Sequence, residues 1–186
     1  MLNIDGDQIS IAIDLDQGAR LASVQWRDMQ FVTPFNGATV TQCYEILDNA
    51  LRWSLEYEAN DCDLPVTLGF HPWFAREIGK GDSAELLFAA NKMFKRGDDH
   101  LPTGEIINPT SPPWDDTFME VLGVPEILWP GAARLTMECN TPYWMVYSQD
   151  EDGICIEPVT APPDAQNLGI EGDTYIECLI TFDEDR

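Results

Sequence analysis

Two ionisable side chains each stand immediately before a proline: His71 in the segment Gly-Phe-His-Pro-Trp-Phe (69–74), and Glu157 in Ile-Glu-Pro-Val (156–159). The ring of proline disfavours helical backbone for the residue before it, so both side chains are expected on extended backbone. An imidazole and a carboxylate held in this way can give and take protons at neutral pH. His71 and Glu157 are therefore the candidate acid–base residues.

Each of these two residues also has a structural interpretation. A lone histidine on a strand is more often a hydrogen-bonding structural residue than a catalyst. Near His71, however, Phe70 and Phe74 would form apolar walls, and Trp73 would offer an aromatic face to a sugar ring. A carboxylate among apolar residues must be paired, hydrogen-bonded or functional, because burying it unpaired is costly. For Glu157 the structural and functional interpretations both stay open.

The other polar candidates have simpler interpretations. Asp115 and Asp116 follow a proline-rich loop at 108–114, and acidic pairs on an acidic surface are usually only solvated. Asp164 and Asn167 are typical turn formers. Two histidines in unrelated contexts and five scattered cysteines predict no metal site. No glycine-rich phosphate loop and no Gly-x-Ser-x-Gly motif is present, so no nucleotide cofactor and no serine hydrolase chemistry are expected.

The composition limits the partners. The net charge is −23, from 33 acidic and 10 basic residues, which argues against nucleic acid or anionic lipid and disfavours a phosphorylated substrate. No apolar run approaches the roughly 20 residues of a membrane helix. The five cysteines show no Cys-x-x-Cys spacing and no basic leader opens the chain, so we expect reduced thiols in a cytoplasmic protein.

Apolar and polar residues alternate with a period of two nearly everywhere, for example over 51–57, 134–139 and 176–182. Each such stretch predicts a strand with one buried and one wet face, which is typical of antiparallel sheets. No long segment has the spacing of an amphipathic helix. Ten or more short strands predict an all-β fold, an antiparallel β-sandwich that forms a single domain over residues 1–186. Further strands are expected at 9–13, 21–26, 40–47, 66–74, 85–89, 143–148 and 154–159.

The segments 64–74 and 156–167 resemble the two signature segments of the aldose 1-epimerases, the galactose mutarotase-like proteins. The stretch 101–118, with Leu-Pro-Thr-Gly-Glu and Trp-Asp-Asp-Thr-Phe, is similar to the region between those signatures. The resemblance implies a truncated galactose mutarotase-like supersandwich, with the sugar in a cleft on one sheet. It implies neither a metal nor a cofactor.

The resemblance also assigns roles. Glu157 would be the general base that removes the proton of the anomeric hydroxyl, and His71 the general acid that protonates the ring oxygen. Asp115 would contact sugar hydroxyls. Trp73 and Asn167 complete the candidate substrate-binding residues.

The chain departs from the family by being shorter. It passes almost directly from 30–32 to the expected strand at 40–47, and the strands that normally lie between are absent. An arginine and a first histidine that help the family to bind its sugar are lost with them. The open edge of such a sandwich would allow pairing into a homo-oligomer.

Two functions are favoured. The first is an isomerase that interconverts the α and β anomers of an aldose, which requires His71 and Glu157 to face one concave pocket about one sugar ring apart. The second is a catalytically weak or silent carbohydrate-binding or regulatory module on the same fold. An epimerase of sugar phosphates is a third, less attractive option, because so few basic residues are present.

Overall fold

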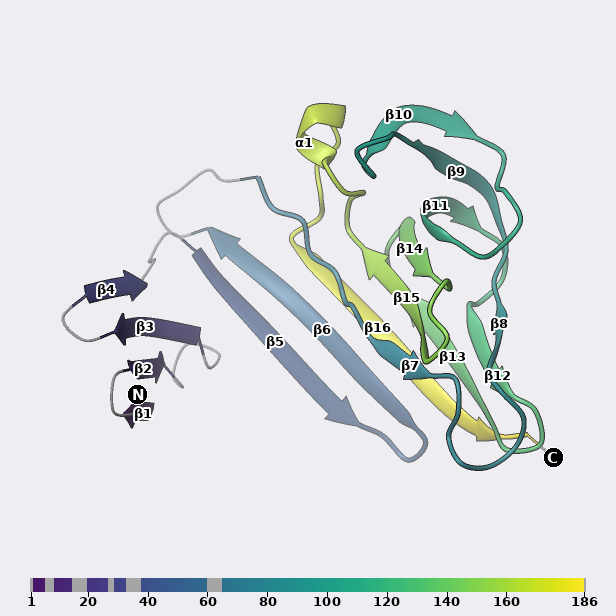
Figure 1. Cartoon of the computed structure of the whole chain (residues 1–186), viewed down its shortest axis with the longest axis horizontal. Coiled ribbons are helices and arrows are strands. Elements are labelled where there is room, and N and C mark those ends of the chain that lie inside the picture. The colour runs from purple at the N-terminus through teal and green to yellow at the C-terminus, as the bar shows by residue number, and fades with distance from the viewer. Residues whose placement is uncertain are drawn as a thin grey trace. The chain divides into compact units, whose positions relative to one another are not determined.

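Strands make up nearly all of the regular structure in the computed structural model (Figure 1). The structure describes all atoms of residues 38–59 and 65–185, and the backbone of four strands before residue 33. The segment 33–37 of the shortened region and Cys62 lie outside the described residues. The described strands are β1 (Leu2–Asp5), β2 (Ile9–Asp14), β3 (Arg20–Trp26), β4 (Met29–Val32), β5 (Ala38–Ile46), β6 (Ala50–Ala59), β7 (Trp73–Ala75), β8 (Glu85–Leu87), β9 (Ala90–Arg96), β10 (Pro102–Ile107), β11 (Asp115–Val121), β12 (Glu126–Trp129), β13 (Ala133–Cys139), β14 (Tyr143–Tyr147), β15 (Gly153–Val159) and β16 (Tyr175–Glu184).

Two six-stranded antiparallel sheets form the sandwich. Their strand orders are β10-β9-β11-β14-β15-β7 and β5-β6-β16-β13-β12-β8, and the strands β1 to β4 form a separate sheet. The all-β sandwich predicted from the alternation is therefore confirmed. The contacts divide the chain into two compact units, residues 1–42 with 56–64 and residues 43–55 with 65–186. The prediction of a single domain over 1–186 stays a prediction.

The alternation in β15 shows how the first sheet separates core from site. Ile154 and Ile156 are fully buried and belong to the core, together with Phe118 of β11 and Val146 of β14. Burying each such side chain contributes on the order of 1.5–3 kcal/mol. Because neighbouring residues of a strand point to opposite faces, Cys155 and Glu157 lie on the other face of the same strand.

The predicted strand at 66–74 is wrong over most of its length. Only Trp73–Ala75 forms the strand β7, and before it the segment makes a single isolated bridge at Gly69. Pro65 and Pro72 have no backbone N–H to donate to a ladder, which explains why this extended segment forms so little sheet. Six strands were not expected, namely β1, β4, β9, β10, β11 and β12, and neither was the single helical turn α1 (Ala165–Leu168).

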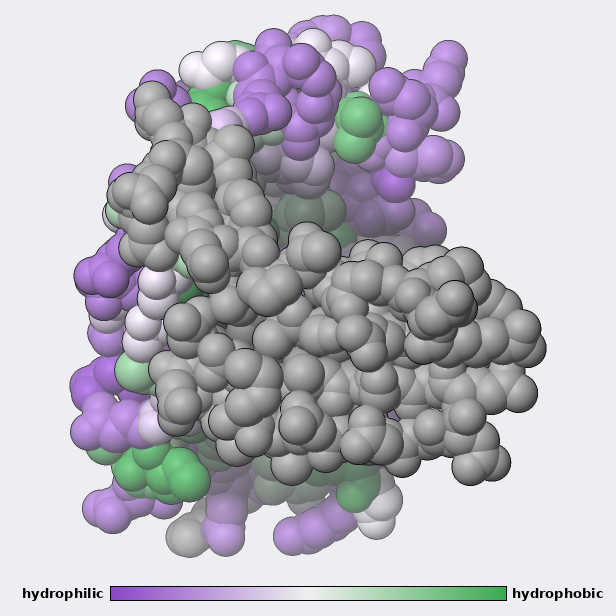
Figure 2. Space-filling view, turned by 90° about the vertical axis from the view of Figure 1, so that its left-hand side faces the viewer, coloured by the Kyte–Doolittle hydropathy of each residue, from purple (hydrophilic) through white to green (hydrophobic). Residues whose placement is uncertain are grey.

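The described surface agrees with the acidic composition. Figure 2 shows mainly hydrophilic residues where this face is coloured, with hydrophobic residues gathered in a few separate patches. In the described part of the chain, no helix is long and apolar enough to span a membrane.

Candidate active site

His71 and Glu157 lie directly opposite each other on neighbouring antiparallel segments. Trp73 of β7 pairs with Cys155 of β15, and the isolated bridge joins Gly69 to Val159. Continuing that register places His71 opposite Glu157. Residues that pair in this way point to the same face of a sheet, with Cβ atoms about 4.5–5.5 Å apart. The sheet register thus brings together two side chains, His71 and Glu157, that are 86 positions apart in the sequence.

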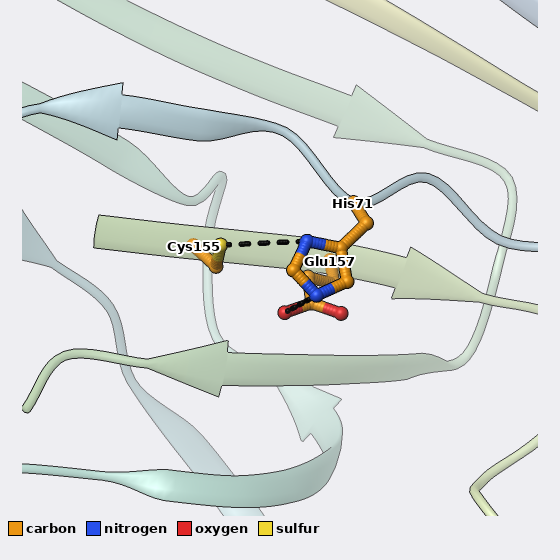
Figure 3. Close-up of side chains that lie close together, drawn as sticks. All are labelled: His71, Cys155 and Glu157. Atoms are coloured by element: carbon orange, nitrogen blue, oxygen red, sulfur yellow. Dashed lines mark hydrogen bonds and ion pairs between the residues drawn. The ribbon is translucent and has the colours of Figure 1, made fainter. Parts of the chain in front are cut away.

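The two side chains are in contact. His71 Nε2 lies 3.4 Å from Glu157 Oε1, and His71 Nδ1 lies 3.6 Å from the Cys155 Sγ (Figure 3). The side chain of His71 is 62% exposed, whereas that of Glu157 is only 9% exposed. An accessible imidazole therefore covers a nearly buried carboxylate.

The surroundings perturb the acid–base properties of this cluster. Burial raises the pKa of Glu157 above its usual range, and the negative charge of Asp115 adds to the rise; the positive charge that His71 can carry and a hydrogen bond from Cys155 oppose it. Burial, followed by the charge of Glu157, raises the pKa of the Cys155 thiol to about 12. Glu157 is thus a stronger base than an exposed carboxylate, and Cys155 is a protonated thiol at neutral pH.

Cross-strand pairs extend the site face across the sheet in two rows. In one row, Asp115 of β11 pairs with Tyr147 of β14, Tyr147 with Cys155, and Cys155 with Trp73. In the other row, Met145 of β14 separates Glu157 from Thr117 of β11. All of these side chains share one face, because directly paired residues do so. Strands in a sheet lie about 4.7–4.9 Å apart, so β11 and β15 are separated by about 9–10 Å across β14.

Trp73 forms a partly exposed aromatic wall beside the pair. Its ring centroid lies 6.1 Å from that of His71 and 5.5 Å from that of Tyr147, and the residue is 53% exposed. The indole packs over Gly153, where an added Cβ would lie 2.6 Å from it. A side chain at this position would therefore displace the indole from its place beside β15.

The carboxylate of Asp115 forms an ion pair with Arg96. Its Oδ2 lies 2.6 Å from Nη1 of Arg96, which also donates to the Asp115 backbone carbonyl. Arg96, Asp115, Thr117 and Met145 help to line a small open pocket, and Met145 is the cross-strand partner of Glu157.

The geometry differs in one respect from the expectation of a shared pocket one sugar ring wide. His71 and Glu157 touch each other, and neither lines the adjacent pocket. The contact has a physical reason: a buried carboxylate needs a hydrogen-bonding partner, and the exposed imidazole supplies it.

Asn167 is not brought to this cluster. It is exposed, and its amide donates to the Asp164 carboxylate over 2.6 Å at the start of α1. Glu157 would have a purely structural role if it formed an ion pair with Arg52 or Arg134. Instead, Arg52 pairs with Glu45 and Glu177, and Arg134 pairs with Glu126.

Sequence reasoning missed two residues of the site. The sequence indicated only a reduced thiol at Cys155; the side chain is buried, and it also contacts His71. Its position two residues before Glu157, on the same face of a strand, was a signal for this. Arg96 gave no signal, since β9 was not expected. Although no metal site was predicted, one possible ligand atom from each of His71, Cys155 and Glu157 lies within 4.8 Å of the other two.

Comparisons with known proteins give a consistent picture. Residues 37–172 match the family model described as Aldose 1-epimerase. No curated protein sequence matches significantly.

Two solved structures share the fold. A GalM/aldose epimerase homologue from C. elegans has 14% identity and a TM-score of 0.61, over 100% of this chain and 69% of its own. A galactose mutarotase-like protein from Clostridium acetobutylicum has 16% identity and a TM-score of 0.62, over 99% of this chain and 65% of its own. This chain therefore spans about two thirds of the length of either protein.

Proposed function

The chain belongs to the aldose 1-epimerase family, and on that premise we propose that it interconverts the α and β anomers of an aldose by acid–base catalysis. The observation that carries the proposal is the contact between His71 Nε2 and Glu157 Oε1 over 3.4 Å, on an accessible face of the sheet. A proton donor and a proton acceptor are thus held together where a small molecule can reach them.

The reaction needs two proton transfers at neighbouring oxygens of the sugar. Glu157 takes the proton of the anomeric hydroxyl while His71 gives one to the ring oxygen; the bond between C1 and the ring oxygen breaks and a C1 carbonyl forms. After rotation about the C1–C2 bond, the ring oxygen attacks the other face of C1. His71 then takes back a proton and Glu157 returns one. Both oxygens are bonded to the same carbon, so an acid and a base only a few ångströms apart can serve them.

The neighbouring residues support a place for the sugar over β14. Trp73 would stack against the apolar face of the ring beside His71. Asp115 and Arg96 would meet hydroxyl groups at the far end, since β11 lies about 9–10 Å from β15 across β14. That separation is comparable with the span of one hexose and its hydroxyl groups.

The second candidate function is a silent carbohydrate-binding module, and one observation favours it. The pocket lined by Arg96, Asp115 and Met145 does not include the acid–base pair, and the Asp115 carboxylate is held by Arg96. A sugar that occupied only this pocket would bind without reaching His71 or Glu157.

Polarimetry separates the two functions. Freshly dissolved α-glucose and α-galactose change rotation slowly in buffer, and the wild-type protein is expected to accelerate that change in proportion to its concentration. Protein that binds the sugar in calorimetry but leaves the buffer rate unchanged would establish the module instead. The exposed variant Glu105→Gln, whose carboxylate pairs with Lys95, serves as the control and should match the wild type.

The raised pKa of Glu157 predicts the pH dependence of the reaction. The base must be ionised, so kcat/KM should rise with pH through a pKa above the usual carboxylate range. The negative charge of Asp115 contributes to that rise, and Asp115→Asn should move the acid limb to lower pH. The pH profile of kcat/KM for the wild type and Asp115→Asn checks this. In the control variant Glu105→Gln, the pH at which kcat/KM rises should be the same as in the wild type. An acid limb that Asp115→Asn leaves unmoved would contradict the assignment of Glu157 as the base.

A further inference from the structure

The proposed reaction makes no use of the Cys155 thiol, although this buried side chain contacts the imidazole that the reaction needs. The same thiol lies on the same strand face as Glu157, whose charge raises its pKa. Three side chains of types that bind transition metals therefore meet at one point of the sheet. Figure 3 shows the ring of His71 lying between the sulfur of Cys155 and the carboxylate of Glu157.

The three side chains are close enough to share one ion after a small movement. One possible ligand atom from each lies within 4.8 Å of the other two, whereas ligands of a tetrahedral zinc ion lie about 3.4–3.6 Å apart. The two close contacts use different ring nitrogens, Nδ1 to Cys155 Sγ over 3.6 Å and Nε2 to Glu157 Oε1 over 3.4 Å. One ion takes only one of these nitrogens, so the imidazole must turn to bind it, and its 62% exposure leaves it the space to do so.

The charges also favour a cation here. Glu157 is nearly buried and the carboxylate of Asp115 acts on it, while the nearby guanidinium of Arg96 is held by Asp115 itself. Among the described residues that contact Glu157, only His71 can carry a positive charge. On binding, a divalent ion would displace the thiol proton of Cys155 to solvent and would balance the carboxylate and the resulting thiolate together.

We propose that His71, Cys155 and Glu157 bind a Zn²⁺ ion, with the fourth position open on the exposed side. A thiolate, an imidazole and a carboxylate form a ligand set typical of zinc, whereas magnesium and calcium prefer oxygen ligands alone. The ion would occupy the acid and the base at once, so it would inhibit anomer interconversion. That consequence rests on the proposed function, whereas the binding itself does not.

Cobalt titration tests the site directly. Co²⁺ replaces Zn²⁺ in tetrahedral sites and gives a thiolate-to-metal charge-transfer band, so carboxylates on this acidic surface do not contribute to the signal. The full chain is titrated with Co²⁺ in the presence of excess Ca²⁺, which occupies adventitious oxygen sites. We expect one Co²⁺ ion to bind per chain and to give the charge-transfer band. The band should disappear when Zn²⁺ is added, because Zn²⁺ displaces Co²⁺.

Matched variants assign the sulfur. Cys155→Ser should abolish the charge-transfer band, whereas Cys43→Ser and Cys139→Ser should keep it. His71→Ala changes an exposed side chain, so its folding is not at risk, and it should weaken Zn²⁺ binding at least tenfold in calorimetry. Absence of the band in the wild type, its persistence in Cys155→Ser, or unchanged Zn²⁺ affinity in His71→Ala would each overturn the proposal. None of these readouts uses a sugar, so a failed metal site and a failed epimerase are distinguishable.

Discussion

Replacing Glu157 by glutamine is expected to lower kcat/KM for anomer interconversion by about 10²–10⁴-fold, the usual contribution of a general base. Glutamine keeps the size of the side chain and a hydrogen bond to His71, but it cannot accept the proton of the anomeric hydroxyl. Polarimetry on both anomers of glucose and galactose measures the loss. Glu105→Gln removes one carboxylate from an exposed ion pair on β10 and should leave the rate unchanged. An active Glu157→Gln protein would show that the base lies elsewhere.

The same substitution should also raise stability at neutral pH. Burial raises the pKa of Glu157 in the folded state, so stability falls as the pH rises from the unfolded pKa through the folded one. Glutamine is uncharged, so its burial does not carry the free-energy cost of burying an ionised carboxylate. The free energy of unfolding, measured by denaturant titration, should therefore be higher for Glu157→Gln above that pKa, and the gain should shrink in acid. A loss of stability at neutral pH would mean that the ion pair with His71 outweighs the burial of the carboxylate.

Replacing His71 by alanine is expected to lower kcat/KM by a similar factor, about 10²–10⁴-fold, because the ring oxygen then has no proton donor. The side chain is 62% exposed, so its removal should change the free energy of unfolding little. Because the side chain is exposed, the variant can also be tested by chemical rescue. Imidazole added to the solution can enter the vacated space and should restore part of the activity in a concentration-dependent way.

Rescue distinguishes a proton donor from a structural residue. A merely structural role of His71 would give a variant that imidazole does not restore. Equal effects of imidazole on the His71→Ala variant and on the wild type would contradict the assignment, since they would reflect catalysis by imidazole in solution alone.

The sequence predicted the strand that holds Glu157, although not the whole sheet, because alternation is a local property. Residues 153–159 show one apolar and one mixed face, and the structure confirms both the strand and the burial of its apolar face. The strand β9 was not predicted because Met93 and Phe94 are adjacent and both buried, which breaks the alternation of apolar and polar residues. The strand β11 begins with Asp115 and Asp116, a pair that reads as loop.

The contacts within the site depend on strand register, which no local pattern contains. Nothing near residue 71 indicates that it pairs with residue 157, and only the signature segments linked them beforehand. The contact of His71 with Cys155 follows from the same register. The Arg96–Asp115 pair needed two strands that the pattern did not reveal.

The most direct test of the central claim, that His71 and Glu157 act as one unit on one sugar, is the rate of anomer exchange at equilibrium, measured by NMR for the wild type, both single variants and the double variant. Residues that act as a unit do not lose activity additively. We predict that the His71→Ala/Glu157→Gln double variant is no slower than the slower single variant. Losses that multiply in the double variant, or a wild-type rate equal to that of buffer, would contradict the account.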